Sequence, residues 1–428
     1  MNNQRGVSFK ERIPLFIDKE QKEDGTYYSY DGHNYGYISA EELKEMKAFK
    51  TDYLPIFRDA KHDTIANESY DKTDKKSRKY KVKTLKRLYT EFIRDAPILL
   101  KETKGLINLY KTGTNVKTAV ELAFHFLNQN DITAEDITLT ESEWIENAST
   151  GPIVFGEKYE GNTFKYDLNS AYPSVYSDTH LLIPVKQGTF KKLTKDEFLK
   201  KGFVSYGIYR CIIEYNNDDK DNYKIFKLND TNYYTNIDIN YAVKLGFKIT
   251  LIEDCDYNFL SYDRSKTKTG HEMFSEFVKL LYPLRKNEII KDRVKSFLRC
   301  LWGALSQRNI FKKVYKMDVE AELFDCEIVE MIPHNDDSYK ITYMKSNRPY
   351  ETNYARIKPF LLAKGREKIS KYISPYKQHI KRCHTDSMSS TIELKHIETS
   401  LELGKMKLER TGDCIITNSM NEEWREEK

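Results

Sequence analysis

Residues 166–176 read YDLNSAYPSVY, and this stretch decides how the rest of the chain is interpreted. The residues before Asp167, FKY, are typical of a β-strand, and Pro173 marks a turn. Asp167 is therefore expected at a strand end, where a carboxylate projects into a cleft and can bind a cation. Mg²⁺ prefers oxygen ligands, and the carbonyl of Leu168 can supply another. Taken alone, an aspartate at a strand end is more often a turn or cap residue.

A second carboxylate of this kind lies in residues 382–390, which read RCHTDSMSS. The pattern of residues 379–394 predicts a strand, a tight turn and a second strand, with Asp386 in the turn. Alone, this too is commonly turn chemistry. Two carboxylates that are distant in sequence but both at strand ends can hold two Mg²⁺ ions about 3.5–4 Å apart.

A basic helix face lies between these two segments. Lys291, Lys295, Arg299 and Trp302 follow one another at helical spacing and therefore share a face. The opposing face is apolar, with Ile290, Val294, Phe297, Leu298, Leu301 and Leu305. A solvated basic stripe is the default explanation of such a face. Trp302 argues against it, because a large aromatic side chain usually makes a contact.

The segment 166–176 resembles motif A of family B DNA polymerases, D-x-x-S-L-Y-P-S, with Ala171 in place of the leucine. It is most similar to the protein-primed branch, in which D-x-N-S-x-Y-P is typical. The resemblance implies that Asp167 and the Leu168 carbonyl bind metal and that Ser170 contacts DNA. It also implies that Tyr172 packs under the incoming sugar and excludes a 2′-hydroxyl. Without the motif, Tyr172 would be interpreted as a core aromatic residue.

The segment 295–303, KSFLRCLWG, resembles motif B, K-x-x-x-N-S-x-Y-G. The resemblance implies that Lys295 neutralises the triphosphate, with Lys291 as an auxiliary cation. Trp302 replaces the usual tyrosine and keeps a flat surface for the nascent base pair next to Gly303. Arg299 stands where asparagine is usual, which changes its expected contact with the nucleotide.

Segment 382–390 resembles motif C, Y-G-D-T-D-S, with Thr385 and Asp386 matching. The resemblance implies that Asp386 is the principal metal ligand of this motif and that Thr385 lies beside the DNA. His384 replaces the first aspartate, which removes one negative charge from the expected site.

A shorter match lies between these motifs. Residues 360–367, FLLAKGRE, resemble the T-x-x-G-R element that contacts template DNA in this family, with Leu362 in place of the threonine. Gly365 and Arg366 match, which implies that both lie at the DNA.

The fold class expected from these matches is α+β. It combines a polymerase right-hand fold, with an antiparallel palm sheet and helical fingers, with a mainly helical N-terminal region whose first 70 residues look irregular. The expected domains are 1–140, then 141–270 as the first part of the palm with an insertion, 271–315 as fingers and 316–428 as the second palm part with motif C.

Asp18 and Glu20 have the spacing of one proofreading element, but no second or third element follows, so a complete exonuclease is not expected. The segment 401–409 resembles the approach to the last palm motif, but its K-x-Y pair is missing, so the thumb is expected to be truncated or absent.

The composition indicates the cellular compartment in which the protein is expected. The 428 residues carry a formal net charge of +5, and none of the six cysteines forms a C-x-x-C pair, so no structural zinc site is expected. No apolar run reaches the roughly 20 residues of a membrane span. These features favour an intracellular, reducing compartment: cytoplasm, viral replication site, nucleus or mitochondrion. The basic run at 75–87 is interpreted equally well as a solvated linker or as a contact to nucleic-acid phosphates.

The function expected is DNA-directed DNA polymerisation in a virus, plasmid or mobile element. The expected cofactor is Mg²⁺, as two ions, with Mn²⁺ as a substitute. The expected partners are primer–template DNA and deoxynucleoside triphosphates, together with a terminal protein for priming or a chain that supplies the thumb. Two alternatives stay open: a decayed polymerase core that still binds DNA or a partner, and a polymerase-like enzyme with altered chemistry.

Overall fold

The computed structural model describes residues 12–22, 24–48, 52–57, 78–198, 204–216, 219–319, 323–395 and 397–425. The chain forms two compact units. The first contains Met1–His125 and Phe277–Leu301, and the second contains Phe126–Glu276 and Trp302–Lys428. Each unit therefore combines segments that are far apart in the sequence.

The first unit contains a four-stranded sheet with the order β3-β2-β1-β4. Its strands are β1 (Ile13–Gln21), β2 (Tyr27–Tyr30), β3 (Tyr35–Ile38) and β4 (Tyr53–Phe57). The N-terminal segment of this unit also contains helices α1 (Ala40–Ala48), α2 (Arg78–Glu102) and α3 (Leu109–Thr112), and most of α4 (Asn115–Gln129). The expectation of an irregular start was wrong, because the tyrosine-rich stretches are β-prone and pair with one another. Residues 75–77 of the basic run lie outside the described residues, and so do the side chains of residues 78–82 and of Glu20.

The second unit is built on a six-stranded sheet with the order β20-β19-β6-β18-β17-β5, in which all neighbours are antiparallel. The strands are β5 (Val154–Gly156), β6 (Tyr159–Leu168), β17 (Ile380–His384), β18 (Ser387–Ser390), β19 (Met406–Ile416) and β20 (Glu422–Trp424). The expected strand, turn and strand around Asp386 are confirmed, and so is the strand that carries Asp167.

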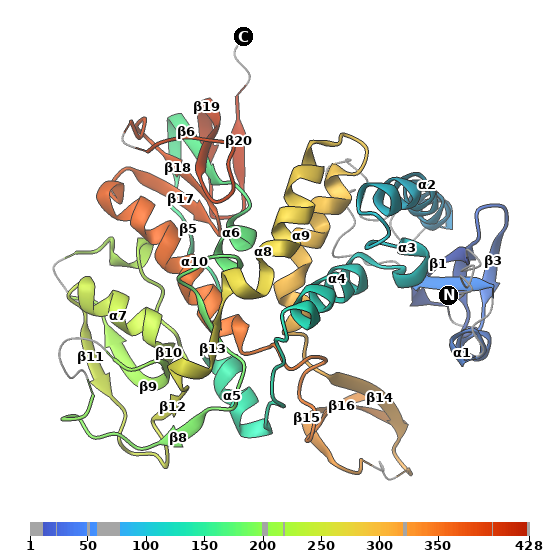
Figure 1. The fold of residues 1–428 in the computed structure, drawn as a ribbon, viewed down its shortest axis with the longest axis horizontal. Helices are drawn as coiled ribbons and strands as arrows, with labels where there is room; N and C mark the ends of the chain where they lie inside the picture. Colours follow the sequence, from blue (N-terminus) through green and yellow to red (C-terminus); the bar gives the residue numbers. More distant parts are fainter. Residues whose placement is uncertain are drawn as a thin grey trace, which may run out of the picture. The chain divides into compact units, whose positions relative to one another are not determined.

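One long helix, α10 (Ile357–Ile373), packs against this sheet (Figure 1). Ile369 and Ile373 of the helix are buried with Tyr166, Cys383 and Met388 of the strands in one core cluster. Burial of such side chains typically contributes about 1.5–3 kcal/mol each, which fixes the helix over β6 and the β17–β18 hairpin. The core of this unit therefore lies directly under the strand ends that carry both candidate aspartates.

The second unit also contains three further sheets. The second sheet has the order β10-β9-β12-β8, with β11 also paired to β9, and two smaller sheets have the orders β13-β7 and β14-β16-β15. Their strands are β7 (Leu182–Pro184), β8 (Thr189–Lys191), β9 (Gly207–Glu214), β10 (Tyr233–Thr235), β11 (Lys248–Leu251), β12 (Phe259–Ser261), β13 (Thr267–Thr269), β14 (Ile310–Lys316), β15 (Cys326–Asn335) and β16 (Ser338–Lys345). The other helices are α5 (Leu139–Asn147), α6 (Ala171–Tyr176), α7 (Asn236–Lys244), α8 (Gly270–Leu281) and α9 (Lys291–Leu305), the last two each running from one unit into the other.

The six cysteines all lie within the described residues and are free thiols. Across the described parts of the chain, the helices are too short or too polar to cross a membrane.

An ion cluster next to β5 gives a pH-dependent contribution to stability. Glu157 accepts hydrogen bonds or ion pairs from Lys224 at 2.7 Å and Lys381 at 2.9 Å, and from the hydroxyl of Tyr223 at 2.7 Å. Burial raises the pKa of Glu157, but these partners lower it more, to about 2. Because the pKa is depressed on folding, the contribution is complete above the unfolded value of about 4.5 and disappears as the pH falls towards 2.

We therefore expect Glu157→Gln to lower the free energy of unfolding at pH 7 and to flatten its fall between about pH 4.5 and pH 2. Urea unfolding of both proteins across this pH range measures the effect. An unchanged acid limb in the variant would show that Glu157 does not carry this linkage.

Candidate active site

The two candidate aspartates lie at adjoining strand ends of the central sheet. Ser387, at the start of β18, pairs with Asp167, near the end of β6. The N–H of Leu168 donates to the carbonyl of Asp386 at 2.8 Å. Thr385 has φ +65° and completes the two-residue turn between β17 and β18. The structure therefore brings together two carboxylates that are 219 positions apart in the sequence (386 minus 167).

A lysine that was not predicted lies at the same place. Lys407 on β19 pairs with Asp167 in the strand register, and its Nζ lies 3.1 Å from Asp167 Oδ2. Burial lowers the pKa of Lys407, but the charges of Asp167 and Glu409 raise it more, so the ammonium group stays protonated at neutral pH. Lys407 lies in the segment 401–409, but the sequence does not reveal the register between β6 and β19 that places this lysine at Asp167.

The backbone turns sharply after Asp167. Ser170 has φ +52°, in the left-handed region, and directly precedes α6. The side-chain amide of Asn169 donates to the carbonyls of Leu401 and Glu402, the latter at 3.1 Å. The N–H of Gly404 donates to the carbonyl of Asn169 at 2.8 Å. These bonds fix the turn against the loop before β19 and so determine the direction in which α6 leaves the sheet.

A small pocket extends from Asp386 beneath α6. Six predicted site residues line it with Pro152, Ile153, Ala171, Val175, Leu362 and Ile369; they are Leu168, Tyr172, Gly365, Arg366, Thr385 and Asp386. The ring of Tyr172 packs against that of Trp302, with centroids 5.1 Å apart and planes inclined by 30°. Burial, and then the charge of Asp386, raise the pKa of Tyr172 to about 12, so this phenol is neutral at physiological pH. Trp302 therefore packs against Tyr172, and its expected role as a flat surface for the nascent base pair stays a prediction.

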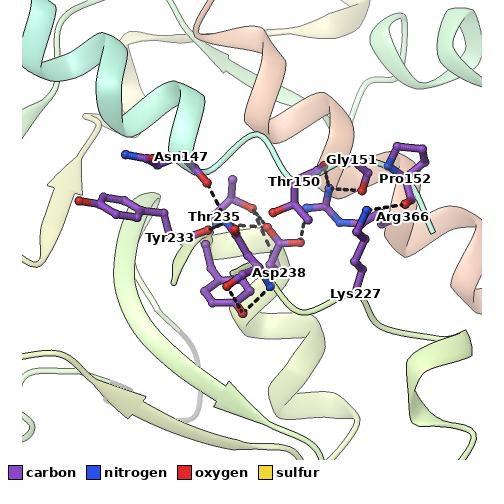
Figure 2. A network of polar contacts seen from close by, with 11 residues as sticks. Asn147, Thr150, Gly151, Pro152, Lys227, Tyr233, Thr235, Asp238 and Arg366 are labelled. Carbon is purple, nitrogen blue, oxygen red and sulfur yellow. Dashed lines mark hydrogen bonds and ion pairs between the residues drawn. The ribbon is translucent and has the colours of Figure 1, made fainter. Parts of the chain in front are cut away.

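Arg366 has internal partners that its predicted contact with DNA did not anticipate. Its Nη2 lies 2.7 Å from Asp238 Oδ1, and its Nη1 donates to the carbonyls of Thr150 and Gly151. Asp238 in turn belongs to the capping box of α7 with Thr235. Figure 2 shows the guanidinium of Arg366 between Asp238 and the 150–152 segment.

This network limits what Arg366 can do. The side chains of Arg366 and Asp238 are each 6% exposed, so the guanidinium has little surface left for a phosphate. Gly365, one position earlier, faces Tyr172. A Cβ at this position would lie 3.8 Å from the Tyr172 ring, which is an ordinary contact distance. A contact of Gly365 or Arg366 with DNA stays a prediction, whereas the observed contacts of Arg366 join α10, α7 and the segment before β5.

The basic residues of α9 belong to the first unit up to Leu301. Lys295 and Arg299 are exposed, and Lys291 forms an ion pair of 2.5 Å with Glu288. Val294, Phe297, Leu298 and Leu301 are buried on the other side, which confirms the predicted two-faced helix. Arg293 fixes α9 to α2 through Asp95, with Nε 2.6 Å from Oδ2. Roles of Lys291, Lys295 and Arg299 towards a triphosphate stay predictions.

The oxygen atoms of this site suit a small divalent ion. Asp167 and Asp386 supply carboxylates and Leu168 a carbonyl, and Mg²⁺ commonly takes one or two carboxylates and fills its shell with water and phosphate oxygens. No cluster of three or more histidine, cysteine, aspartate or glutamate side chains occurs in the described ranges, so a metal cage made only of protein side chains is not seen there. His384, beside the turn, has a buried Nδ1 for which the described residues provide no hydrogen-bond partner.

The sequence matches no protein-family model and no curated protein. The fold, in contrast, is similar to solved structures of Phi29 DNA polymerase. The complex with primer–template DNA, in the post-translocation binary state, matches with a TM-score of 0.56 and 14% identity over 94% of this chain and 85% of that one. The complex with single-stranded DNA matches with a TM-score of 0.55 and 16% identity over 91% of this chain and 68% of that one. The ternary complex with primer–template DNA and incoming nucleotide substrates matches with a TM-score of 0.54 and 14% identity, over 93% and 70%.

At 14–16% identity these matches show a shared fold and leave the chemistry open. The antiparallel central sheet with candidate carboxylates at its strand ends therefore belongs to a chain whose fold is distantly similar to that of a DNA polymerase.

Proposed function

We propose that this protein is a DNA-directed DNA polymerase that adds deoxynucleotides to a primer 3′-hydroxyl. The single observation that carries the proposal is the meeting of Asp167 and Asp386 at adjoining strand ends, beside a pocket lined by Tyr172. The similarity to Phi29 DNA polymerase bound to primer–template DNA supports DNA as the partner. Priming by a terminal protein stays a prediction from the sequence.

Asp167, Asp386 and the Leu168 carbonyl would hold two Mg²⁺ ions. Such ions neutralise the charge on the attacking and leaving oxygens of a phosphoryl transfer. The chain contributes the position of these ligands, which the Leu168–Asp386 hydrogen bond and the turn at Thr385 fix. Positioning and charge neutralisation supply most of the catalysis in this type of reaction.

The other proposed contacts concern the nucleotide and the DNA. Tyr172, supported by Trp302, would form a flat wall beneath the incoming sugar, and Gly303 follows Trp302 with space around it. The exposed Lys295 and Arg299, with Lys291, would bind the triphosphate. Ser170 precedes α6, and Thr385 and Gly365 line the pocket; these three residues would approach the primer–template. Arg366 would act mainly through its buried contacts, which hold α10 in place beside them.

A template-directed extension assay tests the proposal. A labelled primer is annealed to four templates that differ in the first unpaired base, and each is incubated with one deoxynucleotide at a time and with Mg²⁺ or Mn²⁺. We expect addition of the complementary nucleotide in each case. DNA binding without addition under either metal would instead favour a decayed core that retains only binding.

Tyr172 provides a prediction about sugar selection. We expect Tyr172→Val to raise incorporation of ribonucleotides relative to deoxynucleotides by at least about tenfold, because removal of the ring opens space for one hydroxyl. Tyr172→Phe should keep the wild-type ratio, since the neutral ring and not the phenol oxygen forms the wall. Single-nucleotide kinetics with matched ribo- and deoxynucleotides measure both ratios. Equal ratios in wild type and Tyr172→Val would rule out Tyr172 as the gate.

A further inference from the structure

A row of alternating charges begins at Asp167 and crosses the central sheet. Lys407 Nζ lies 3.1 Å from Asp167 Oδ2 and 3.3 Å from Glu409 Oε1. Lys165 Nζ lies 3.4 Å from Glu409 Oε2 and 2.5 Å from Glu422 Oε1. Arg382 continues the row at 3.3 Å from Glu422 Oε2. Each cation in the row up to Lys165 is therefore shared by two carboxylates.

The far end of the row is the most buried. The side chains of Asp167, Lys407 and Glu409 are 23%, 30% and 39% exposed, whereas those of Glu422 and Arg382 are 10% and 8% exposed. Lys407 therefore lies in the more exposed part of the row, where its ammonium group contacts both Asp167 and Glu409.

We propose that Lys407 is an intramolecular counter-ion of Asp167. Its ammonium group competes with a divalent cation for the Asp167 carboxylate and pairs with Glu409 alone when that cation binds. The inference rests on the proposed function, because it takes Asp167 as a metal ligand. Two cations cannot share one small carboxylate without mutual repulsion, so the position of Lys407 sets the metal affinity of the site. Glu409 lowers the cost of moving Lys407 aside, because it offers a second carboxylate within reach.

This arrangement predicts that substitutions of Lys407 and of Glu409 change the metal affinity in opposite directions. Loss of the cation in Lys407→Met should tighten metal binding, and loss of its alternative partner in Glu409→Gln should weaken it. We expect changes of about two- to fivefold in each direction, the size that a partly exposed ion pair supports. A purely structural role for this pair would move the affinity in the same direction in both variants, because both would disturb β19.

The experiment measures Mn²⁺ binding to the full chain by electron paramagnetic resonance, without nucleotide or DNA. It compares wild type, Lys407→Met, Glu409→Gln and Asp167→Asn, with circular dichroism as a check of folding. Lys405→Met is the matched control, since Lys405 lies two positions earlier, is 45% exposed at its side chain and pairs with Glu398 at 3.6 Å. The control removes the same charge without touching Asp167 and should leave the affinity within about twofold of wild type.

The outcomes separate the inference from the proposed function. Opposite shifts in Lys407→Met and Glu409→Gln support the inference. Asp167-dependent Mn²⁺ binding that is unchanged, or weakened, in Lys407→Met overturns the inference and leaves the metal site standing. If neither wild type nor Lys407→Met binds Mn²⁺ through Asp167, the proposed metal site fails and the inference fails with it.

Discussion

Replacement of Asp167 or Asp386 by asparagine is expected to lower the rate of nucleotide addition by about 100-fold or more. A metal ion at a phosphoryl-transfer site contributes several kcal/mol of charge stabilisation, and each 1.36 kcal/mol corresponds to a factor of ten in rate. Asparagine keeps the size of the side chain and removes its negative charge. Both carboxylates lie at adjoining strand ends, so the two variants should have similar defects.

Glu393→Gln serves as the control for this prediction. Glu393 is an exposed carboxylate that follows β18, seven positions after Asp386, and its replacement removes the same charge. The control variant should extend a primer at the wild-type rate. Rates in Asp167→Asn and Asp386→Asn that stay within a few-fold of this control would show that the reaction does not depend on the two carboxylates.

Arg356→Leu is expected to destabilise the second unit by about 3–5 kcal/mol, because it leaves a buried carboxylate without its cation. The side chains of Arg356 and Glu141 are 0% and 2% exposed. Arg356 Nε and Nη2 each lie 2.7 Å from a different oxygen of Glu141, and Nη1 donates to the carbonyl of Glu135 at 2.7 Å. This two-pronged pair joins the start of α10 to α5 and so supports the helix that lines the candidate site.

A double-mutant cycle separates the pair from its surroundings. Glu141→Leu with Arg356→Leu should be less destabilising than the sum of the two single changes, because no uncompensated charge remains. Urea unfolding followed by tryptophan fluorescence reports on this unit, because Trp144, Trp302 and Trp424 all belong to it. The exposed pair of Lys248 and Glu214 is the control, and its loss should cost at most about 1 kcal/mol. Single-variant losses below that level, or full additivity, would contradict the account.

The parts of the site that could be predicted from sequence are those set by local chain geometry. The strand before Asp167, the two-faced helix at Lys295 and the hairpin around Asp386 all follow from spacing and turn chemistry over a few residues. The similarity of the fold to Phi29 DNA polymerase agrees with the α+β expectation.

The parts that could not be predicted depend on pairing between distant segments. Lys407 reaches Asp167 only through the register of β19 against β6, and one residue of slip would turn it to the other face. Arg366 matched a DNA-binding element, but its partner Asp238 comes from a helix 128 positions earlier. The first strands were missed because their tyrosines gain stability from cross-strand neighbours, which a single segment does not reveal.

Addition of one nucleotide by wild type and by Asp386→Asn, measured side by side on a primed template with Mg²⁺ and with Mn²⁺, tests the central claim most directly. The account predicts that wild type adds the complementary deoxynucleotide and that Asp386→Asn binds the same DNA but adds it at least about 100-fold more slowly. Equal rates in the two proteins, or DNA binding by wild type with no addition under either metal, would contradict it.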